Sequence, residues 1–306
     1  MSASKIVFFG NERLATGVKT TAPTLQALIS TGYQIVGLVI AQSEIGQSRE
    51  AREPEIVQIA KDHNITIYQP AKIRDIYDQL SALRADIGVL VAFGKMVPQP
   101  IIDIFPHGIV NIHPSLLPKH RGPTPLESAI LAGDQQTGVS LMQLSSAMDA
   151  GPVYAQTSTV LYGHETKQAL ADLLINLGKD MLITNLPAIL DGSLQPIAQD
   201  EAQAEYDTLI VKTASQLDFN QPAEILERQV RAYAGWPRSR TIINGVEVII
   251  TAAHTFDGVN VPGSLWIDDK QFGFYTAKGI LVIDRLIPAG KKDMDVVSFM
   301  AGYKIK

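Results

Sequence analysis

Short apolar runs alternate with amphipathic segments along the first two-thirds of this chain. The spacing predicts strands at 6–9, 35–40, 65–68, 87–93 and 109–112, separated by segments with helical periodicity. Strands that are buried on both faces are continuous apolar runs, and alternation with helices is typical of a parallel sheet. We therefore expect a fold of the α/β class, with a Rossmann-like, mostly parallel sheet and flanking helices.

The pattern changes after a last long helical stretch at 166–190. Before it, the runs 138–144 and 153–160 have no long helix between them, which predicts antiparallel strands at one edge of the sheet. After it, 191–207 is rich in Gly, Ser, Gln, Pro and acidic residues, as in a linker. One helix at 222–233 and five short β runs then predict a small C-terminal β-barrel, OB-like in character. The expected domains are 1–190 and 208–306, with 191–207 joining them.

Composition narrows the class of protein. The chain has 306 residues, of which 46% are hydrophobic and 19% charged, with a net charge of −5. It has no cysteine, which excludes disulfides, thiolate zinc sites and thiol nucleophiles. Apolar runs such as 87–93 are too short to span a membrane, and no export signal precedes the first strand. We expect a soluble, cytoplasmic protein with no membrane contact.

Two common ligand motifs are missing. The first predicted strand ends at Gly10 without the G-x-G-x-x-G spacing that would bind a dinucleotide, so no NAD is expected. No G-x-x-x-x-G-K-[ST] loop is present either. The histidines show no metal-ligand spacing to one another, so no metal is expected.

The end of the predicted strand at 109–112 carries the first candidate chemistry. Alternation along a strand puts Asn111 and His113 on the same face, at the edge where open α/β sheets bind ligands. An amide and an imidazole side by side can stabilise an oxygen that gains negative charge during acyl transfer. The alternative is a buried Asn and His that only hydrogen-bond neighbouring loops.

Asp149 is the third candidate, in the loop between the two edge strands. Its carboxylate could orient the imidazole and accept a proton from an attacking amine. The alternative is an Asp that hydrogen-bonds its own turn, next to Gly151. Because no cysteine and no G-x-S-x-G serine offers a nucleophile, the set favours direct transfer between two bound substrates.

These residues resemble the folate-dependent formyltransferases, and within them the enzymes that act on methionyl-tRNA. The resemblance covers nearly the whole chain. It rests on Asn111-x-His113-Pro-Ser-Leu-Leu-Pro118 with Asp149 beyond it, on 122–133 and 133–139, and on Asp218-Phe219, 226–233, Trp236-Pro237 and 288–292. It implies formyl transfer from 10-formyltetrahydrofolate to the amino group of methionine on initiator tRNA, with tetrahydrofolate released. Asn111 and His113 would stabilise the oxyanion, and Asp149 would hold His113 and help to remove the amine proton.

The resemblance also implies binding residues. The loop that lines the folate pocket would consist of Ser115, Leu116, Leu117 and Pro118, and the pterin would be wrapped by Phe93, Met96 and Val97. Arg121 is a further candidate for a substrate contact. The implied partners are initiator methionyl-tRNA and the folate, and we expect a monomer.

The chain departs from the family pattern at four places, one of which is an extreme C-terminus that stops soon after 299–302. Where the family usually has Thr-Pro together with an aromatic residue, this chain has Asn11-Glu12-Arg13-Leu14. Phe219 stands where the family has a Trp. The loop 42–54, which would bind the acceptor stem, is short and keeps only Arg49 and Arg52 as basic residues. Residues 206–306 carry 12 basic and 11 acidic side chains, against 14 and 20 in residues 1–205, so phosphate contacts are expected in the C-terminal part, at Lys291 and Lys292.

Two other functions stay open at this point. One is a sugar N-formyltransferase that acts on a nucleotide-linked amino sugar with the same Asn, His and Asp. The other is a non-enzymatic folate- or RNA-binding protein on the same scaffold, which predicts loss of at least one of Asn111, His113 and Asp149. All three are present.

Overall fold

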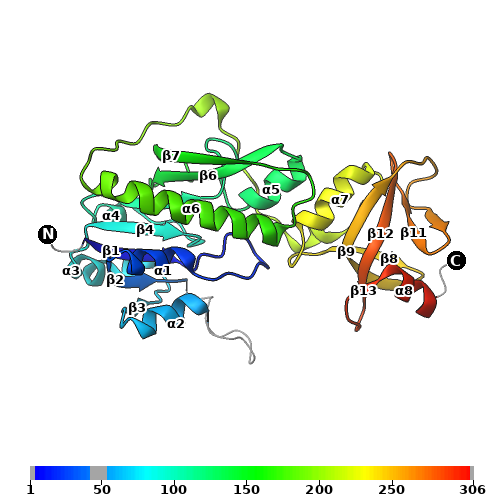
Figure 1. Cartoon of the computed structure of the whole chain (residues 1–306), viewed down its shortest axis with the longest axis horizontal. Coiled ribbons are helices and arrows are strands. Elements are labelled where there is room, and N and C mark those ends of the chain that lie inside the picture. The colour runs from blue at the N-terminus through cyan, green and yellow to red at the C-terminus, as the bar shows by residue number, and fades with distance from the viewer. Residues whose placement is uncertain (1–3, 42–53, 304–306) are drawn as a thin grey trace. The chain divides into compact units, whose positions relative to one another are not determined.

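The computed structural model describes residues 4–41 and 54–303, and these form two compact units. Unit 1 contains the described part of Met1–Pro125 together with Gln136–Val160 and Leu170–Thr208. Unit 2 contains Leu126–Gln135, Leu161–Ala169 and the described part of Leu209–Lys306. Figure 1 labels most of the helices and strands of both units.

A seven-stranded sheet forms the centre of unit 1, with strand order β3-β2-β1-β4-β5-β6-β7. The first five of these strands pair in parallel, and β6 and β7 pair antiparallel at one edge. This confirms the mostly parallel sheet with an antiparallel edge. The strands are β1 (Lys5–Gly10), β2 (Gln34–Val39), β3 (Ile67–Tyr68), β4 (Ile87–Val91), β5 (Ile109–His113), β6 (Gln136–Gln143) and β7 (Val153–Val160).

Helices connect the strands of this sheet. Between β3 and β4, a 3-10 helix, Ile73–Ile76, is followed directly by the short α3. The α-helices are α1 (Pro23–Ser30), α2 (Glu55–Asp62), α3 (Tyr77–Ala82), α4 (Gln99–Ile102), α5 (Pro125–Ala132) and α6 (Lys167–Leu190).

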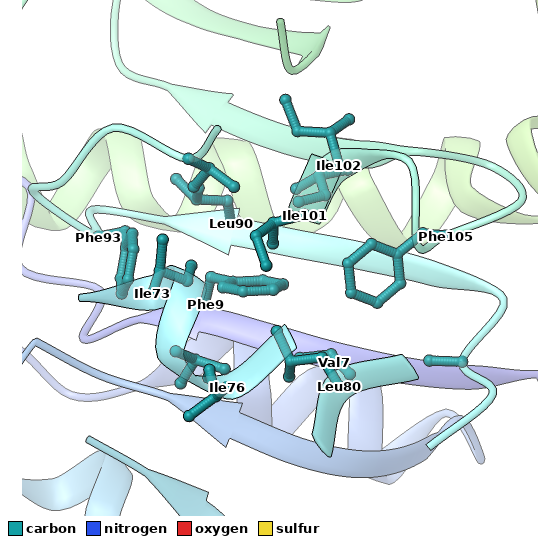
Figure 2. Packing of buried hydrophobic residues seen from close by; sticks show 14 residues of the cluster. Val7, Phe9, Ile73, Ile76, Leu80, Leu90, Phe93, Ile101, Ile102 and Phe105 are labelled. Carbon is teal, nitrogen blue, oxygen red and sulfur yellow. The ribbon is translucent and has the colours of Figure 1, made fainter. Parts of the chain in front are cut away.

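One face of the sheet is closed by a hydrophobic cluster that α3 and α4 complete. Phe9 of β1 lies at its centre, with its ring 5.9 Å from the rings of both Phe93 and Phe105 in edge-to-face geometry. Such pairs each contribute about 0.5–1.5 kcal/mol beyond the area that they bury. Figure 2 shows Ile101 of α4 and Leu80 of α3 reaching into the same cluster. The rigid part of the fold therefore lies directly under the strand ends.

Helix α6 is long and apolar enough to cross a membrane by length and composition alone. In the fold it contributes core residues instead, among them Leu174 and Leu182, which are buried. Its Gly178 lies so close to the sheet that a β-carbon there would meet the Ile112 side chain of β5 at 2.5 Å. We therefore assign α6 as a core helix that packs on β5.

Unit 2 is built on a six-stranded antiparallel sheet with the order β10-β11-β12-β9-β8, and β13 pairs with β12. This confirms the antiparallel C-terminal domain. Its core includes Phe274, on which Phe219 stacks with ring centroids 4.4 Å apart. The elements are α7 (Ala223–Ala232), β8 (Ser239–Ile243), β9 (Val246–Phe256), β10 (Leu265–Asp268), β11 (Gln271–Tyr275), β12 (Ile280–Pro288), β13 (Met294–Asp295) and α8 (Val296–Gly302).

A buried ion pair joins three distant segments inside unit 2. Lys167 Nζ lies 3.3 Å from Glu127 Oε1 and donates to the Trp236 carbonyl oxygen at 2.9 Å. Burial lowers the pKa of Lys167, and the charge of Glu127 opposes that shift. Through this pair, α5 and the start of α6 group with the C-terminal residues. The predicted division at 190 and 208 follows chain order and does not describe this grouping.

Candidate active site

The end of β5 places Asn111 and His113 on one side of the sheet. Ile109, two residues earlier on that side, belongs to the cluster in Figure 2, whereas Ile112 points to the opposite side, towards Gly178. On the neighbouring antiparallel strand β6, Ser140 pairs with His113. The strand therefore anchors both polar side chains on a rigid, apolar base.

The imidazole of His113 is held by a main-chain group. Its Nε2 lies 2.9 Å from the carbonyl oxygen of His120. A carbonyl oxygen only accepts, so Nε2 carries a hydrogen and donates it. This bond fixes the orientation of the buried ring and leaves Nδ1 as the nitrogen that can act on another group.

Asp149 is the group that faces Nδ1. Its Oδ1 lies 3.7 Å from His113 Nδ1, beyond a direct hydrogen bond but within ion-pair distance of a protonated imidazole. Its Oδ2 accepts the main-chain N–H of Gly122 at 2.8 Å. Asp149 has a φ of +48°, a left-handed conformation that is uncommon outside glycine. The carboxylate is thus turned towards the imidazole by a strained loop.

Asn111 is buried on β5, two residues before His113 on the same face of the strand. Within the part of the chain that the structure describes, its carboxamide has no hydrogen-bond partner. The Asn111 Oδ1 and Nδ2 atoms are not among the fully buried side-chain atoms that lack a partner, so the amide reaches the surface at the end of the strand. The amide is therefore available to a ligand oxygen.

Hydrogen bonds to Lys119, to Ser140 of β6 and to Gln156 of β7 hold the loop 115–118 in place. Ser115 is fully buried and its Oγ donates to the Lys119 carbonyl oxygen at 2.6 Å. Leu117 N donates to Ser140 Oγ at 3.1 Å, and Gln156 Nε2 donates to the Leu117 carbonyl at 2.8 Å. Leu116 and Pro118 are half-buried. Ser140 and Gln156 were not identified from the sequence, because neither lies in a motif and each acts only through the folded loop.

The three residues expected around the pterin differ in exposure. Phe93 and Val97 are buried in the hydrophobic cluster under β4, where Phe93 packs on Phe9 (Figure 2). Met96 between them is 54% exposed. Only Met96 therefore presents its side chain at the surface, while the other two form part of the base below the strand ends.

Of the four basic residues expected to contact tRNA, two fall in the part of the chain that the structure describes. Arg49 and Arg52 lie outside the described residues. Lys291 and Lys292 are exposed in the turn that follows β12, and Lys291 N donates to the Pro288 carbonyl at 2.9 Å. In 4–41 and 54–303, no group of three or more His, Asp or Glu side chains is arranged to hold a metal ion.

Arg121, considered as a substrate contact from the sequence, is fully buried and its donors are engaged. All five guanidinium N–H groups reach protein acceptors, on Gln199, Glu201 and Tyr206. Its role is therefore internal. Gln199 and Glu201 fall in the predicted linker, and no local pattern marks them because their partner is 78–80 residues away.

The arrangement combines an unpartnered amide, an oriented imidazole and a nearby carboxylate at the end of a core strand. An amide and an imidazole suit an oxygen that becomes negative, and a carboxylate suits a proton released by an amine. Ser115, whose hydroxyl is engaged, offers no nucleophile. The geometry is suited to acyl transfer between two bound molecules.

Comparisons with known proteins cover both parts of the chain. A family model described as formyl transferase matches residues 4–186, and a second, described as formyl transferase, C-terminal domain, matches residues 209–304. The methionyl-tRNA formyltransferase of Chloroflexus aurantiacus is 35% identical over 306 residues, which cover 97% of this chain and 96% of the relative. That of Pelobacter propionicus is 33% identical over 309 residues, with 100% and 95% covered.

Solved structures share the fold. The N-formyltransferase of Helicobacter canadensis, crystallised with folinic acid and dTDP-3-aminofucose, superposes with a TM-score of 0.70 at 16% identity. The superposition covers 92% of this chain and 98% of that one. At this level of identity, the likeness shows a common fold.

Proposed function

The chain belongs to the formyl transferase family, and from this we propose that it transfers the formyl group of 10-formyltetrahydrofolate to the amino group of methionine on initiator tRNA. The observation that carries this proposal is the similarity to methionyl-tRNA formyltransferases across the full length, both domains included. The products are N-formylmethionyl-tRNA, used to begin protein synthesis, and tetrahydrofolate. That role supports a cytoplasmic location, and we propose a monomer.

The unpartnered Asn111 amide fits the formyl oxygen. As the amino nitrogen adds to the formyl carbon, the carbonyl π electrons move to that oxygen, and Asn111 donates to the resulting oxyanion. His113, oriented through Nε2, presents its Nδ1 edge on the same side of the strand. When Nδ1 is protonated it donates to the oxyanion, and Asp149, 3.7 Å away, balances the imidazolium charge.

Asp149 also receives the proton that leaves the amine, directly or through one water. Collapse of the oxyanion then breaks the bond between the formyl carbon and the folate nitrogen, which takes up a proton. The loop Ser115, Leu116, Leu117 and Pro118, with Met96 and the underlying Phe93 and Val97, binds the folate. Lys291 and Lys292, with Arg49 and Arg52, contact tRNA phosphates.

The test is a formylation assay with 10-formyltetrahydrofolate and methionyl initiator tRNA. Asn111→Asp keeps the shape of the side chain and replaces the donor by an acceptor, so we expect kcat/KM to fall at least 100-fold. The folded state, followed by circular dichroism, should persist. Unchanged turnover would remove Asn111 from the mechanism.

A second acceptor in the same assay distinguishes the tRNA proposal from the alternative function, formylation of an amino sugar. With dTDP-3-aminofucose, we expect no formylation. Formylation of the amino sugar without formylation of methionyl-tRNA would replace the tRNA proposal by a sugar N-formyltransferase that uses the same three residues.

A further inference from the structure

Residues 199–207, here named the strap, bind the loop that follows the proposed folate loop. The strap runs beside Arg121: Arg121 N donates to the Glu205 carbonyl at 2.9 Å, and Asp207 N donates to the Arg121 carbonyl at 2.7 Å. His120 Nδ1 lies 3.1 Å from Asp207 Oδ1. Because the His120 carbonyl holds His113, the strap supports the imidazole side of the site.

The strap also reaches the carboxylate side, through Gln199. Its Nε2 donates to the carbonyl oxygens of Asp149 and Gly151, both at 2.7 Å. A β-carbon on Gly151 would lie 1.8 Å from the Gln143 carbonyl oxygen, so the turn 149–151 is packed tightly on β6. Gln199 therefore clamps both ends of the turn that carries Asp149 without touching its carboxylate.

Arg121 decides which way the Gln199 amide points. Its Nε and one terminal nitrogen donate to Gln199 Oε1 at 3.1 and 2.9 Å. The guanidinium has donors and no acceptor atom, so it can pair only with the oxygen of the carboxamide and not with its NH2 group. Glu201 bonds the two terminal nitrogens at 2.9 and 2.7 Å and fixes the guanidinium plane. The Nε2 donors can then face only the turn.

We propose that Gln199, oriented by Arg121, is a positioning residue that holds the 149–151 turn so that the Asp149 carboxylate faces His113. The inference rests on the proposed function, in which Asp149 receives a proton. The left-handed backbone of Asp149 is unfavourable by itself, and two carbonyl hydrogen bonds from one rigid amide hold it in place. A shift of about 1 Å in a catalytic group can cost about 100-fold in rate.

Gln199→Glu separates the two sides of this contact. The carboxylate keeps an oxygen for Arg121 but loses both donors to Asp149 and Gly151. We expect kcat for methionyl-tRNA formylation to fall at least tenfold, while KM for 10-formyltetrahydrofolate changes less than twofold. Gln203→Glu is the matched control, since it makes the same change in the same strap at an exposed side chain whose donor goes to Asp200. Its kcat should stay within twofold of the wild type.

Hydrogen exchange measured by mass spectrometry gives a readout that does not depend on activity. Peptides covering 145–152 should exchange at least threefold faster in Gln199→Glu than in the wild type, and at the wild-type rate in Gln203→Glu. Unchanged exchange in Gln199→Glu, or an equal loss of kcat in both variants, would overturn the inference. A wild type that formylates no acceptor contradicts the proposed function instead, and the exchange result still decides whether Gln199 holds the turn.

Discussion

Glu12 is a buried carboxyl group with a structural task at the residue scale. Its two carboxylate oxygens accept the main-chain N–H groups of Thr24 and Leu25, both at 2.8 Å, at the start of α1. This satisfies two donors that a helix leaves unpaired at its N-terminus. Burial raises the pKa of Glu12 to about 7, although both hydrogen bonds act in the opposite direction. Glu12 lies in the segment 11–14, where the sequence departs from the family pattern.

The Glu12 pKa predicts how stability changes with pH. Because the folded-state pKa is higher than the ordinary 4.5, the folded protein binds the proton more tightly than the unfolded chain does. The contribution to stability is full below pH 4.5 and is lost as the pH rises to about 7, by about 3 kcal/mol in total. Urea unfolding between pH 4.5 and 8 should show this fall, and Glu12→Gln should flatten it.

Glu205→Gln is the control for this measurement, because the Glu205 side chain is exposed and is not among the groups that shift the pKa of Glu12. Its pH profile should follow the wild type. Parallel profiles for the wild type and Glu12→Gln would contradict the assignment of the titration to Glu12.

At the scale of elements, the contact between helix α6 and strand β5 supports the site. Gly178 lets the helix approach the strand, and a β-carbon would meet Ile112 at 2.5 Å and Val139 at 3.3 Å. Ile112 lies between Asn111 and His113, so pressure on it moves both. A glycine inside a helix ordinarily costs about 1 kcal/mol relative to alanine. Here the close packing is the reason for the glycine.

Gly178→Ala should therefore destabilise the protein despite the better helix propensity of alanine. Overpacking costs about 1–3 kcal/mol, against a gain of about 1 kcal/mol from propensity. We expect a net loss of about 1 kcal/mol in the free energy of unfolding, measured by urea titration. Gly302→Ala, in α8 with no atom within 4 Å of the added carbon, should be neutral or stabilising. Equal stabilisation by both changes would show that α6 is not closely packed on β5.

The elements that the sequence predicted have a strong apolar pattern, and the elements that it missed do not. Strand β4 is a continuous apolar run, and β5 is apolar apart from Asn111 and His113; both strands are buried throughout. Helices α5 and α8 were not predicted. Proline-containing α5 has weak periodicity, and α8 is a short helix whose start depends on Asp295 accepting the Ser298 N–H at 2.7 Å. A single cap is a weaker signal than a repeated face.

Charge distribution is a property of the whole molecule. Residues 1–205 carry a net charge of −6, whereas 206–306 carry +1, which together give the −5 of the chain. In unit 2 several arginines are already paired, such as Arg240 with Glu247 and Arg285 with Asp293. Lys291 and Lys292 are exposed in a turn, which favours them as contacts for phosphates.

Replacing Lys291 and Lys292 together by alanine should weaken tRNA binding and reduce its salt dependence. Each phosphate contact adds about one counterion to the slope of log K against log salt. We expect the slope to fall by about 2, measured by filter binding between 50 and 300 mM salt. A double replacement of Lys212 and Lys270, two exposed lysines of the same unit, is the control and should leave the slope nearly unchanged. An unchanged slope after replacement of Lys291 and Lys292 would mean that these lysines face solvent and do not contact phosphates.

The sequence by itself determined the sheet class, the antiparallel edge and the position of Asn111 and His113 on one face of β5. These follow from local periodicity, since side chains two apart on a strand point the same way. Asp149 could be named from the sequence, and the predicted roles of all three residues stay predictions that the assays above test.

Only the tertiary structure decided which groups hold those side chains. The bond from His113 to the His120 carbonyl, the Gln199 clamp on the Asp149 turn and the five hydrogen bonds of Arg121 join residues from 7 to 85 positions apart. The same is true of the Lys167–Glu127 pair, which groups α5 with the C-terminal residues. Such contacts depend on how packed elements bring distant loops together, and no local pattern of apolar and polar residues encodes them.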